Sequence, residues 1–337
     1  MITWGIVSAA MLMVHTPMQF YIARFLLGVA EAGFAPGIMY LLTLWFPARR
    51  RGRAMALYVM GAPLAFIIGG PLSGWILDAF QDVQPLAAWQ WLFLVEAIPA
   101  LVLGVMVYFW LADDFRKVSW LTAAEKDRID SDLRAENADK VEHGSVRAFL
   151  GSRQLWVFVL IYFCLIMGLY AVGFWMPSLI KRAGVADPFH IGLYCAIPNI
   201  VAAIALYLSG RGADLSGRRR LYFAGMLTLG AVGLALAMLI DGGPLTTVAC
   251  LSLAAAGVYS CISLFWALPT SMFVGASVAA ALAFVNSFGN IAGFVSPYLV
   301  GWLNVSTGRS DVGMYIIGAV MVLGAMVTML LPRHLDK

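Results

Sequence analysis

Residues 20–45 carry an arginine and a glutamate in a stretch otherwise suited to lipid. Arg24, Gly28 and Glu31 are spaced i, i+4 and i+7, so a helix of 3.6 residues per turn places them on one stripe. A charge near the bilayer centre costs at least about 2.5 to 3.5 kcal/mol, and such residues usually face a protein interior or a wet cavity. The guanidinium of Arg24 suits a carboxylate, and Glu31 is a candidate proton carrier. The alternative is a buried ion pair that only fixes helix packing.

Composition indicates a polytopic membrane protein with an all-α fold. Hydrophobic residues make up 62% of the chain and charged residues 12%, where a soluble domain carries about 25% charged residues. Mean hydropathy is +0.86. A bilayer presents about 30 Å of hydrocarbon. Ten apolar runs, the first of them short, are candidates to cross it: residues 2–14, 18–45, 54–77, 90–112, 154–179, 189–209, 221–240, 245–267, 272–303 and 313–331.

Basic residues fall mostly between alternate pairs of runs. Of the 22, 18 follow the second, fourth, sixth or tenth run, whereas the opposite side receives Lys181, Arg182 and Arg309. Positive charge is retained on the cytoplasmic side, so both termini and the loop at 113–153 are predicted to be cytoplasmic. In this loop LTAAEKDRIDSDLRAEN predicts a short amphipathic helix at the membrane surface. Its balanced charge gives no reason to expect nucleic acid.

Cysteine and histidine patterns give no sign of a metal site. Cys164, Cys195, Cys250 and Cys261 lie inside apolar stretches without C-x-x-C spacing and are interpreted as reduced core residues. The four histidines are scattered. No cofactor is predicted. A membrane-embedded enzyme is disfavoured, because no loop carries H-x-x-x-D, G-x-S-x-G or paired histidines.

An internal repeat relates the two sides of the middle loop. Residues 46–75 and 268–302 each begin with an apolar-Pro pair, continue with small residues and end with Pro, a short spacer and Gly-Trp. Such repeats are common in transporters. We expect a four-helix N-terminal half-bundle at 1–112, the middle loop at 113–153 and a six-helix C-terminal half-bundle at 154–337. The repeat register places two further spans before Met1.

Four motifs together resemble the major facilitator superfamily: RFLLGVAEAGFAPG at 24–37, the predicted basic loop RRRGRA at 49–54, GGPLSGW at 69–75 and GRGADLSGRRR at 210–220. More narrowly, they resemble its anion:cation symporters, the branch of tartrate, phthalate, rhamnonate, galactonate and 4-hydroxyphenylacetate permeases. The resemblance implies the major facilitator fold with about ten of twelve helices present. It also implies a monomeric secondary transporter of the bacterial inner membrane.

The loop GRGADLSGRRR is a candidate gate. Its glycines, Gly210, Gly212 and Gly217, are predicted to permit a tight turn between two spans, and Asp214 to pair with an arginine or cap a helix. The resemblance implies that the loop latches the cytoplasmic side when the transporter faces outward, through Gly210, Asp214, Gly217, Arg218 and Arg219. The alternative is that its arginines only fix the topology.

Polar and aromatic side chains in the apolar runs are further candidates for a substrate cavity. They are Asn286, Tyr170, Ser263 and Trp266, of which Asn286 shares a helix face with Asn290. The resemblance implies that the asparagine and the aromatic residues approach the substrate. The alternative is that they make interhelical hydrogen bonds and interfacial anchors.

The function predicted from these features is symport of a proton and a small organic carboxylate by alternating access. The sequence leaves open whether the carboxylate is a sugar acid, a hydroxy-dicarboxylate or an aromatic acid. The alternatives are a transport-incompetent fragment, since the family places further binding residues on the absent first helix, and a transporter-like sensor.

Overall fold

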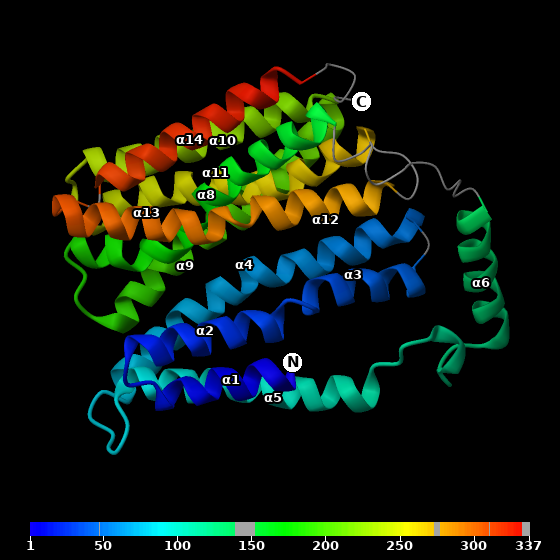
Figure 1. Cartoon of the computed structure of the whole chain (residues 1–337), viewed down its shortest axis with the longest axis horizontal. Helices are drawn as coiled ribbons and strands as arrows, with labels where there is room; N and C mark the ends of the chain where they lie inside the picture. Colours follow the sequence, from blue (N-terminus) through cyan, green and yellow to red (C-terminus); the bar gives the residue numbers. More distant parts are fainter. Residues whose placement is uncertain (47, 139–151, 273–276, 310, 332–337) are drawn as a thin grey trace. The chain divides into compact units, whose positions relative to one another are not determined.

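The computed structural model describes residues 1–46, 48–138, 152–272, 277–309 and 311–331 (Figure 1). Every regular element in these ranges is a helix, which confirms the predicted all-α fold for this part of the chain. The chain divides into two compact units. Unit 1 comprises Met1–Ala62 and Leu72–Lys140, and unit 2 comprises Pro63–Pro71 and Val141–Lys337.

The helices that begin within unit 1 cover the predicted first four runs and the middle loop. They are α1 (Ile2–Ala10), the short 3-10 helix η1 (Met11–Met13), α2 (Pro17–Glu31), α3 (Phe34–Trp45), α4 (Ala48–Ala79), α5 (Ala88–Trp110), η2 (Phe115–Lys117) and α6 (Ala123–Ala138). The helix predicted in the middle loop is present as α6. Arg116 of η2 donates a hydrogen bond to Asp130 of α6 and so holds the pKa of that carboxyl below its ordinary value.

Unit 2 contains the helices of the later runs. They are α8 (Arg153–Arg182), α9 (Pro188–Ser216), α10 (Arg219–Leu239), α11 (Gly243–Met272), α12 (Ser277–Gly289), α13 (Ala292–Thr307) and α14 (Asp311–Met329). Their shared core is built on large side chains with no more than 2% exposure, among them Phe158, Phe223, Phe265, Leu227 and Leu234.

Six helices within the described ranges are long and apolar enough to cross a membrane: Ala88–Trp110, Arg153–Arg182, Pro188–Ser216, Arg219–Leu239, Gly243–Trp266 and Asp311–Met329. Ile2–Met13 and Leu64–Ala79 are shorter apolar helical stretches. The predicted second run is not one helix, because α2 ends at Glu31 and α3 begins at Phe34. Pro36 has no N–H to donate to the carbonyl of Ala32, so the helical ladder breaks one residue after Glu31.

Three more predicted boundaries were wrong. The ninth run is split at residues 290–291, where backbone bonds from Gly293 to Asn290 and from Phe294 to Ile291 tighten the turn. The basic segment at 49–54 is not a loop but the first part of α4. The sixth run continues to Ser216, which places Gly210 and Gly212 inside α9 rather than in a turn.

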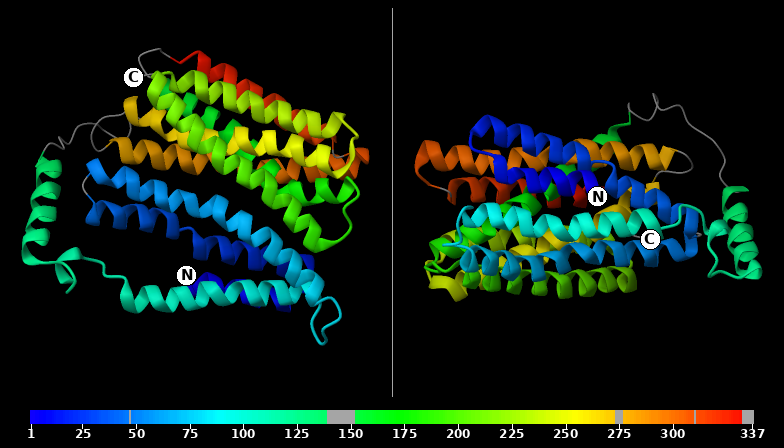
Figure 2. Two further views of the ribbon diagram at one scale, coloured as in Figure 1. Left: turned by 180° about the vertical axis from the view of Figure 1, so that it is seen from behind. Right: turned by 90° about the horizontal axis from the view of Figure 1, so that it is seen from below.

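Small residues let helices approach closely within each unit. α1 lies beside α5 (Figure 2), where a Cβ on Gly5 would be 2.8 Å from Leu101 Cδ2. In unit 2, a Cβ on Gly233 of α10 would be 2.8 Å from the carbonyl oxygen of Cys250 on α11. Close backbone approach of this kind is typical of membrane helices, whose association gains little from hydrophobic burial.

Candidate functional site

The start of α2 fixes where Arg24 stands. Thr16 and Gln19 form a capping box, in which Oγ1 of Thr16 accepts from the N–H of Gln19 at 3.3 Å and Oε1 of Gln19 accepts from the N–H of Thr16 at 3.1 Å. Pro17 follows at the first helical position, where its missing N–H costs nothing. Arg24 therefore lies two turns into a helix that begins at a defined residue.

The guanidinium of Arg24 rests on two aromatic rings. Its central carbon is 5.2 Å from the ring centroid of Phe20 on α2 and 5.8 Å from that of Phe93 on α5. Both distances are within the range of about 6 Å in which a cation is attracted to the face of a ring. Two helices of unit 1 thus hold the cation without using its N–H groups.

Arg24 and Glu31 do not form an ion pair among the described residues. Both side chains are exposed on α2, and α2 has no buried residue. Their separation of seven residues is about 10 Å along the helix axis. The alternative of a buried packing pair is therefore not what the structure shows.

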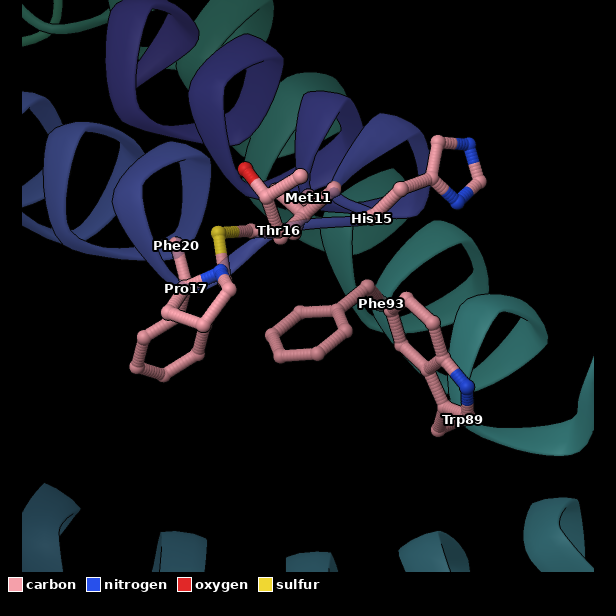
Figure 3. Close-up of a pocket in the computed structure, with 8 residues that line it drawn as sticks. Met11, His15, Thr16, Pro17, Phe20, Trp89 and Phe93 are labelled. Atoms are coloured by element: carbon pink, nitrogen blue, oxygen red, sulfur yellow. The ribbon is translucent and has the colours of Figure 1, made fainter.

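A cavity of about 310 Å³ lies beside this cation. It is lined by Met11, Val14, His15, Thr16, Pro17, Phe20, Trp89 and Phe93. Figure 3 shows Phe20 and Phe93 on either side of Pro17, with the His15 ring directed away from them. The same two rings that contact the guanidinium therefore line an aromatic space.

Glu96 and Ser73 form a polar contact that sequence reasoning missed. Glu96 is the one acidic or basic residue of α5, and its Oε1 accepts a hydrogen bond from the hydroxyl of Ser73 on α4. The signal was available, because a single carboxyl in an apolar run is the pattern that singled out Glu31. Its partner was not predictable, because Ser73 lies 23 residues away on another helix.

In unit 2, Asn286 takes part in a small hydrogen-bonded cluster. Its Oδ1 accepts from the hydroxyl of Tyr162 on α8 at 3.3 Å and from Nδ2 of Asn290 at 2.8 Å. Within the described residues its own amide N–H₂ group donates no hydrogen bond. An amide group presented in this way suits an acceptor such as a carboxylate oxygen.

The other predicted cavity residues of unit 2 divide into two groups. Trp266 joins the Asn286 cluster, because its ring centroid is 4.9 Å from that of Tyr162. Tyr170 lies two turns further along α8 than Tyr162 and stacks on Phe174, with ring centroids 5.8 Å apart. Ser263 donates to the carbonyl of Ser260 on its own helix, so its hydroxyl is used locally.

The segment that joins α9 and α10 contains one of the two contacts predicted for Asp214. Gly217 ends α9 with φ at 61°, a left-handed conformation that favours glycine. Asp214 pairs with Arg219 at 3.1 Å, as one of the two predicted roles required. Arg218 is exposed, whereas Arg220 is buried and donates to the carbonyl of Leu331 after α14.

Potential metal ligands do not cluster in the described part of the chain, where no three His, Cys, Asp or Glu residues gather. The four cysteines are free and buried, as predicted. The contacts on which the candidate site is built are those of Arg24 with the rings of Phe20 and Phe93.

A polytopic helical bundle with an arginine and a glutamate beside a break in a helix is the arrangement expected of a membrane transporter. The family model described as Major Facilitator Superfamily matches residues 1–297 and, in a second match, residues 185–337. The chain belongs to the Major Facilitator Superfamily.

The similar proteins carry the names of membrane transporters. It is 40% identical to "Putative metabolite transport protein NicT" of Pseudomonas putida, covering 99% of this chain and 77% of that protein. It is also 40% identical to "Putative tartrate transporter" of Agrobacterium vitis, covering 100% and 75%. "Inner membrane transport protein RhmT" of Escherichia coli is 34% identical over 96% of this chain and 75% of that protein. The resemblance drawn from the motifs is confirmed.

The fold matches solved transporters. The crystal structure of D-xylose-proton symporter superposes with a TM-score of 0.73 at 18% identity, covering 100% of this chain and 80% of that one. The major facilitator fold is therefore confirmed, and the chain is an integral membrane protein with relatives in the bacterial inner membrane.

Proposed function

We propose that this transporter carries a small organic carboxylate together with a proton by alternating access. The observation that supports this most directly is the guanidinium of Arg24, which rests on Phe20 and Phe93 and has no carboxylate partner among the described residues. Its planar fork of N–H donors suits bidentate binding of a carboxylate. The relative described as a tartrate transporter supports the same class of substrate.

Glu31 is the proposed proton carrier. Two unit charges about 10 Å apart attract each other by roughly 1.6 kcal/mol at an effective dielectric constant of about 20. A carboxylate bound to Arg24 cancels most of this attraction, so protonation of Glu31 and binding of the anion favour each other by about tenfold. Contact between Arg24 and Glu31 is not needed for this linkage.

Further residues of the proposal belong to unit 2 and are proposed by themselves. The amide N–H₂ of Asn286, which donates no hydrogen bond within the described residues, is a proposed donor for a carboxylate oxygen, Trp266 packs beside its partner Tyr162, and Tyr170 and Ser263 stay candidates. Asp214 and Arg219 are proposed to latch the cytoplasmic side together with Gly210, Gly217 and Arg218. We further propose that the transporter is a monomer with both termini in the cytoplasm.

The test is counterflow of labelled tartrate, an aldonate and an aromatic carboxylate in proteoliposomes made with the purified chain. Arg24→Lys is expected to lose at least tenfold in rate, because a point charge does not replace the bidentate fork. Arg128→Lys on exposed α6 is the matched control and is expected to keep the wild-type rate. Equal rates for Arg24→Lys and wild type would rule out Arg24 as the carboxylate site.

The proton-coupling role needs a separate measurement. Glu31→Gln is expected to abolish accumulation driven by a pH gradient while sparing part of the exchange, because Gln cannot carry a proton. Glu125→Gln, in a capping box that accepts either residue, is the control. Accumulation at the wild-type level by Glu31→Gln would exclude the assignment.

A further inference from the structure

Glu96 places a carboxyl group in an apolar helix, which costs free energy. α5 is one of the helices long and apolar enough to cross a membrane, and a carboxylate at mid-bilayer costs about 2.5 to 3.5 kcal/mol even on insertion scales. The hydroxyl of Ser73 on α4 donates a hydrogen bond to Oε1 of Glu96 and so offsets part of this cost. Both residues belong to unit 1, the unit that contains Arg24.

A second polar contact joins α5 to η1. Nε2 of Gln90 donates to the carbonyl oxygen of Leu12 at 2.6 Å, which ties α5 to η1. Gln90 and Glu96 each stand three residues from Phe93, on either side of it. Residues three apart are neighbours on a helix surface, so the two hydrogen bonds bracket Phe93 along one side of α5.

Phe93 is the residue through which α5 reaches the Arg24 site. Its ring is 5.8 Å from the guanidinium carbon of Arg24 and lines the neighbouring cavity. Rotation of α5 by a fraction of a turn would withdraw this ring from the cation. The contacts that set the rotation of α5 therefore set the geometry at Arg24.

We propose that Glu96, held by Ser73, is a positioning residue for the Arg24 site, because the pair fixes α5 so that Phe93 stays against the guanidinium. The role is that of a hydrogen-bond acceptor and does not require a charge. This inference rests on the proposed function only in its kinetic test, since the geometric claim can be measured without a substrate.

Three variants separate the hydrogen bond from the charge. Ser73→Ala and Glu96→Leu are expected to raise the half-saturation concentration of the carboxylate about tenfold with the maximal counterflow rate unchanged within about twofold, as for a loss of ground-state binding. Glu96→Gln keeps an acceptor oxygen for Ser73 and is expected to match wild type, including its pH dependence. Loss of pH-driven accumulation in Glu96→Gln would overturn the proposal.

A double-mutant cycle tests whether the effect passes through Phe93. Phe93→Ala alone is expected to raise the half-saturation concentration of the carboxylate about as much as Ser73→Ala does. The double variant is expected to show no further rise. Additive effects would overturn the positioning role. Ser252→Ala, which removes a buried hydroxyl bonded to Val248 of its own helix, is the matched control and is expected to leave half-saturation unchanged.

The substrate-free measurement uses cysteines at Phe20 and Phe93, joined by a short bifunctional maleimide in the purified chain. The native cysteines are buried and give a low background. Adding Ser73→Ala is expected to slow this cross-linking at least threefold, whereas Ser252→Ala leaves it unchanged. Equal cross-linking rates would overturn the proposal. If the wild type transports no carboxylate but the rates differ, the proposed function fails and the positioning role stands.

Discussion

Arg24 shows how aromatic rings can hold a guanidinium while its N–H groups donate to no carboxylate within the described residues. A guanidinium over an aromatic ring gains about 0.5 to 2 kcal/mol, most when water is excluded. Phe20 and Phe93 therefore offset part of the cost of placing Arg24 in an apolar span. The rings act on the face of the guanidinium, so the N–H donors in its plane are left for an anion.

The Asn286 cluster gives a prediction for single side chains. Tyr162→Phe removes the hydroxyl that donates to Oδ1 of Asn286, which should cost about 1 kcal/mol of stability. If Asn286 also binds substrate, half-saturation in counterflow is expected to rise several-fold as the amide loses its orientation. Tyr207→Phe, at an exposed tyrosine of α9, is the control. Equal behaviour of the two variants would remove Asn286 from the substrate site.

The spacing of Arg24 and Glu31 predicted a shared stripe correctly, because both lie on one helix with a defined start. What the sequence did not reveal at this scale are partners from other helices. Phe93 beneath Arg24 and Ser73 beside Glu96 are 69 and 23 residues away, and no local pattern announces either contact. The predicted salt-bridge partner for Asp214 was found because it stands five residues away.

At the scale of elements, two breaks in predicted apolar runs lie beside the candidate site residues Glu31 and Asn286. α2 ends at Glu31 because Pro36 interrupts the ladder, and α12 ends at Gly289, just before Asn290. Irregular backbone at membrane depth is tolerated where it is buried in protein or lines a cavity. Pro36 was visible in the sequence, so the first break was predictable. The second was not, because it is a turn closed by backbone bonds from Gly293 to Asn290 and from Phe294 to Ile291, with no proline to announce it.

Glycines of the α12–α13 segment accept aromatic rings of α8. A Cβ on Gly293 would be 2.8 Å from Cζ of Tyr170, and one on Gly289 would meet the Tyr162 ring. Gly293→Ala is therefore expected to destabilise the protein by about 1 to 3 kcal/mol through overpacking. The melting temperature in detergent measures this.

Gly301 provides the matched control for that change. It lies on the same helix, α13, and a Cβ there would meet nothing within 4 Å. Gly301→Ala is expected to leave the melting temperature unchanged or slightly raised, because alanine loses less backbone entropy than glycine in a helix. Equal loss of stability in both variants would mean that Tyr170 is not packed against α13.

At the scale of the whole molecule, charge decides the orientation. Eighteen of the 22 basic residues lie in the segments that follow the second, fourth, sixth and tenth apolar runs. α6 lies in one of these basic segments, whereas the end of α8 lies on the side that carries few basic residues. Retention of basic segments in the cytoplasm predicts that α6 is inside and that the α8–α9 connection is outside.

Cysteine labelling tests this orientation directly, since the four native cysteines are buried. Arg128→Cys on α6 and Lys181→Cys near the end of α8 both replace exposed side chains. In right-side-out vesicles an impermeant maleimide is expected to label Lys181→Cys at once and Arg128→Cys only after permeabilisation. The reverse labelling order would mean that the protein has the opposite orientation in the membrane. Asp214 and Arg219 would then face the outside and could not latch the cytoplasmic side.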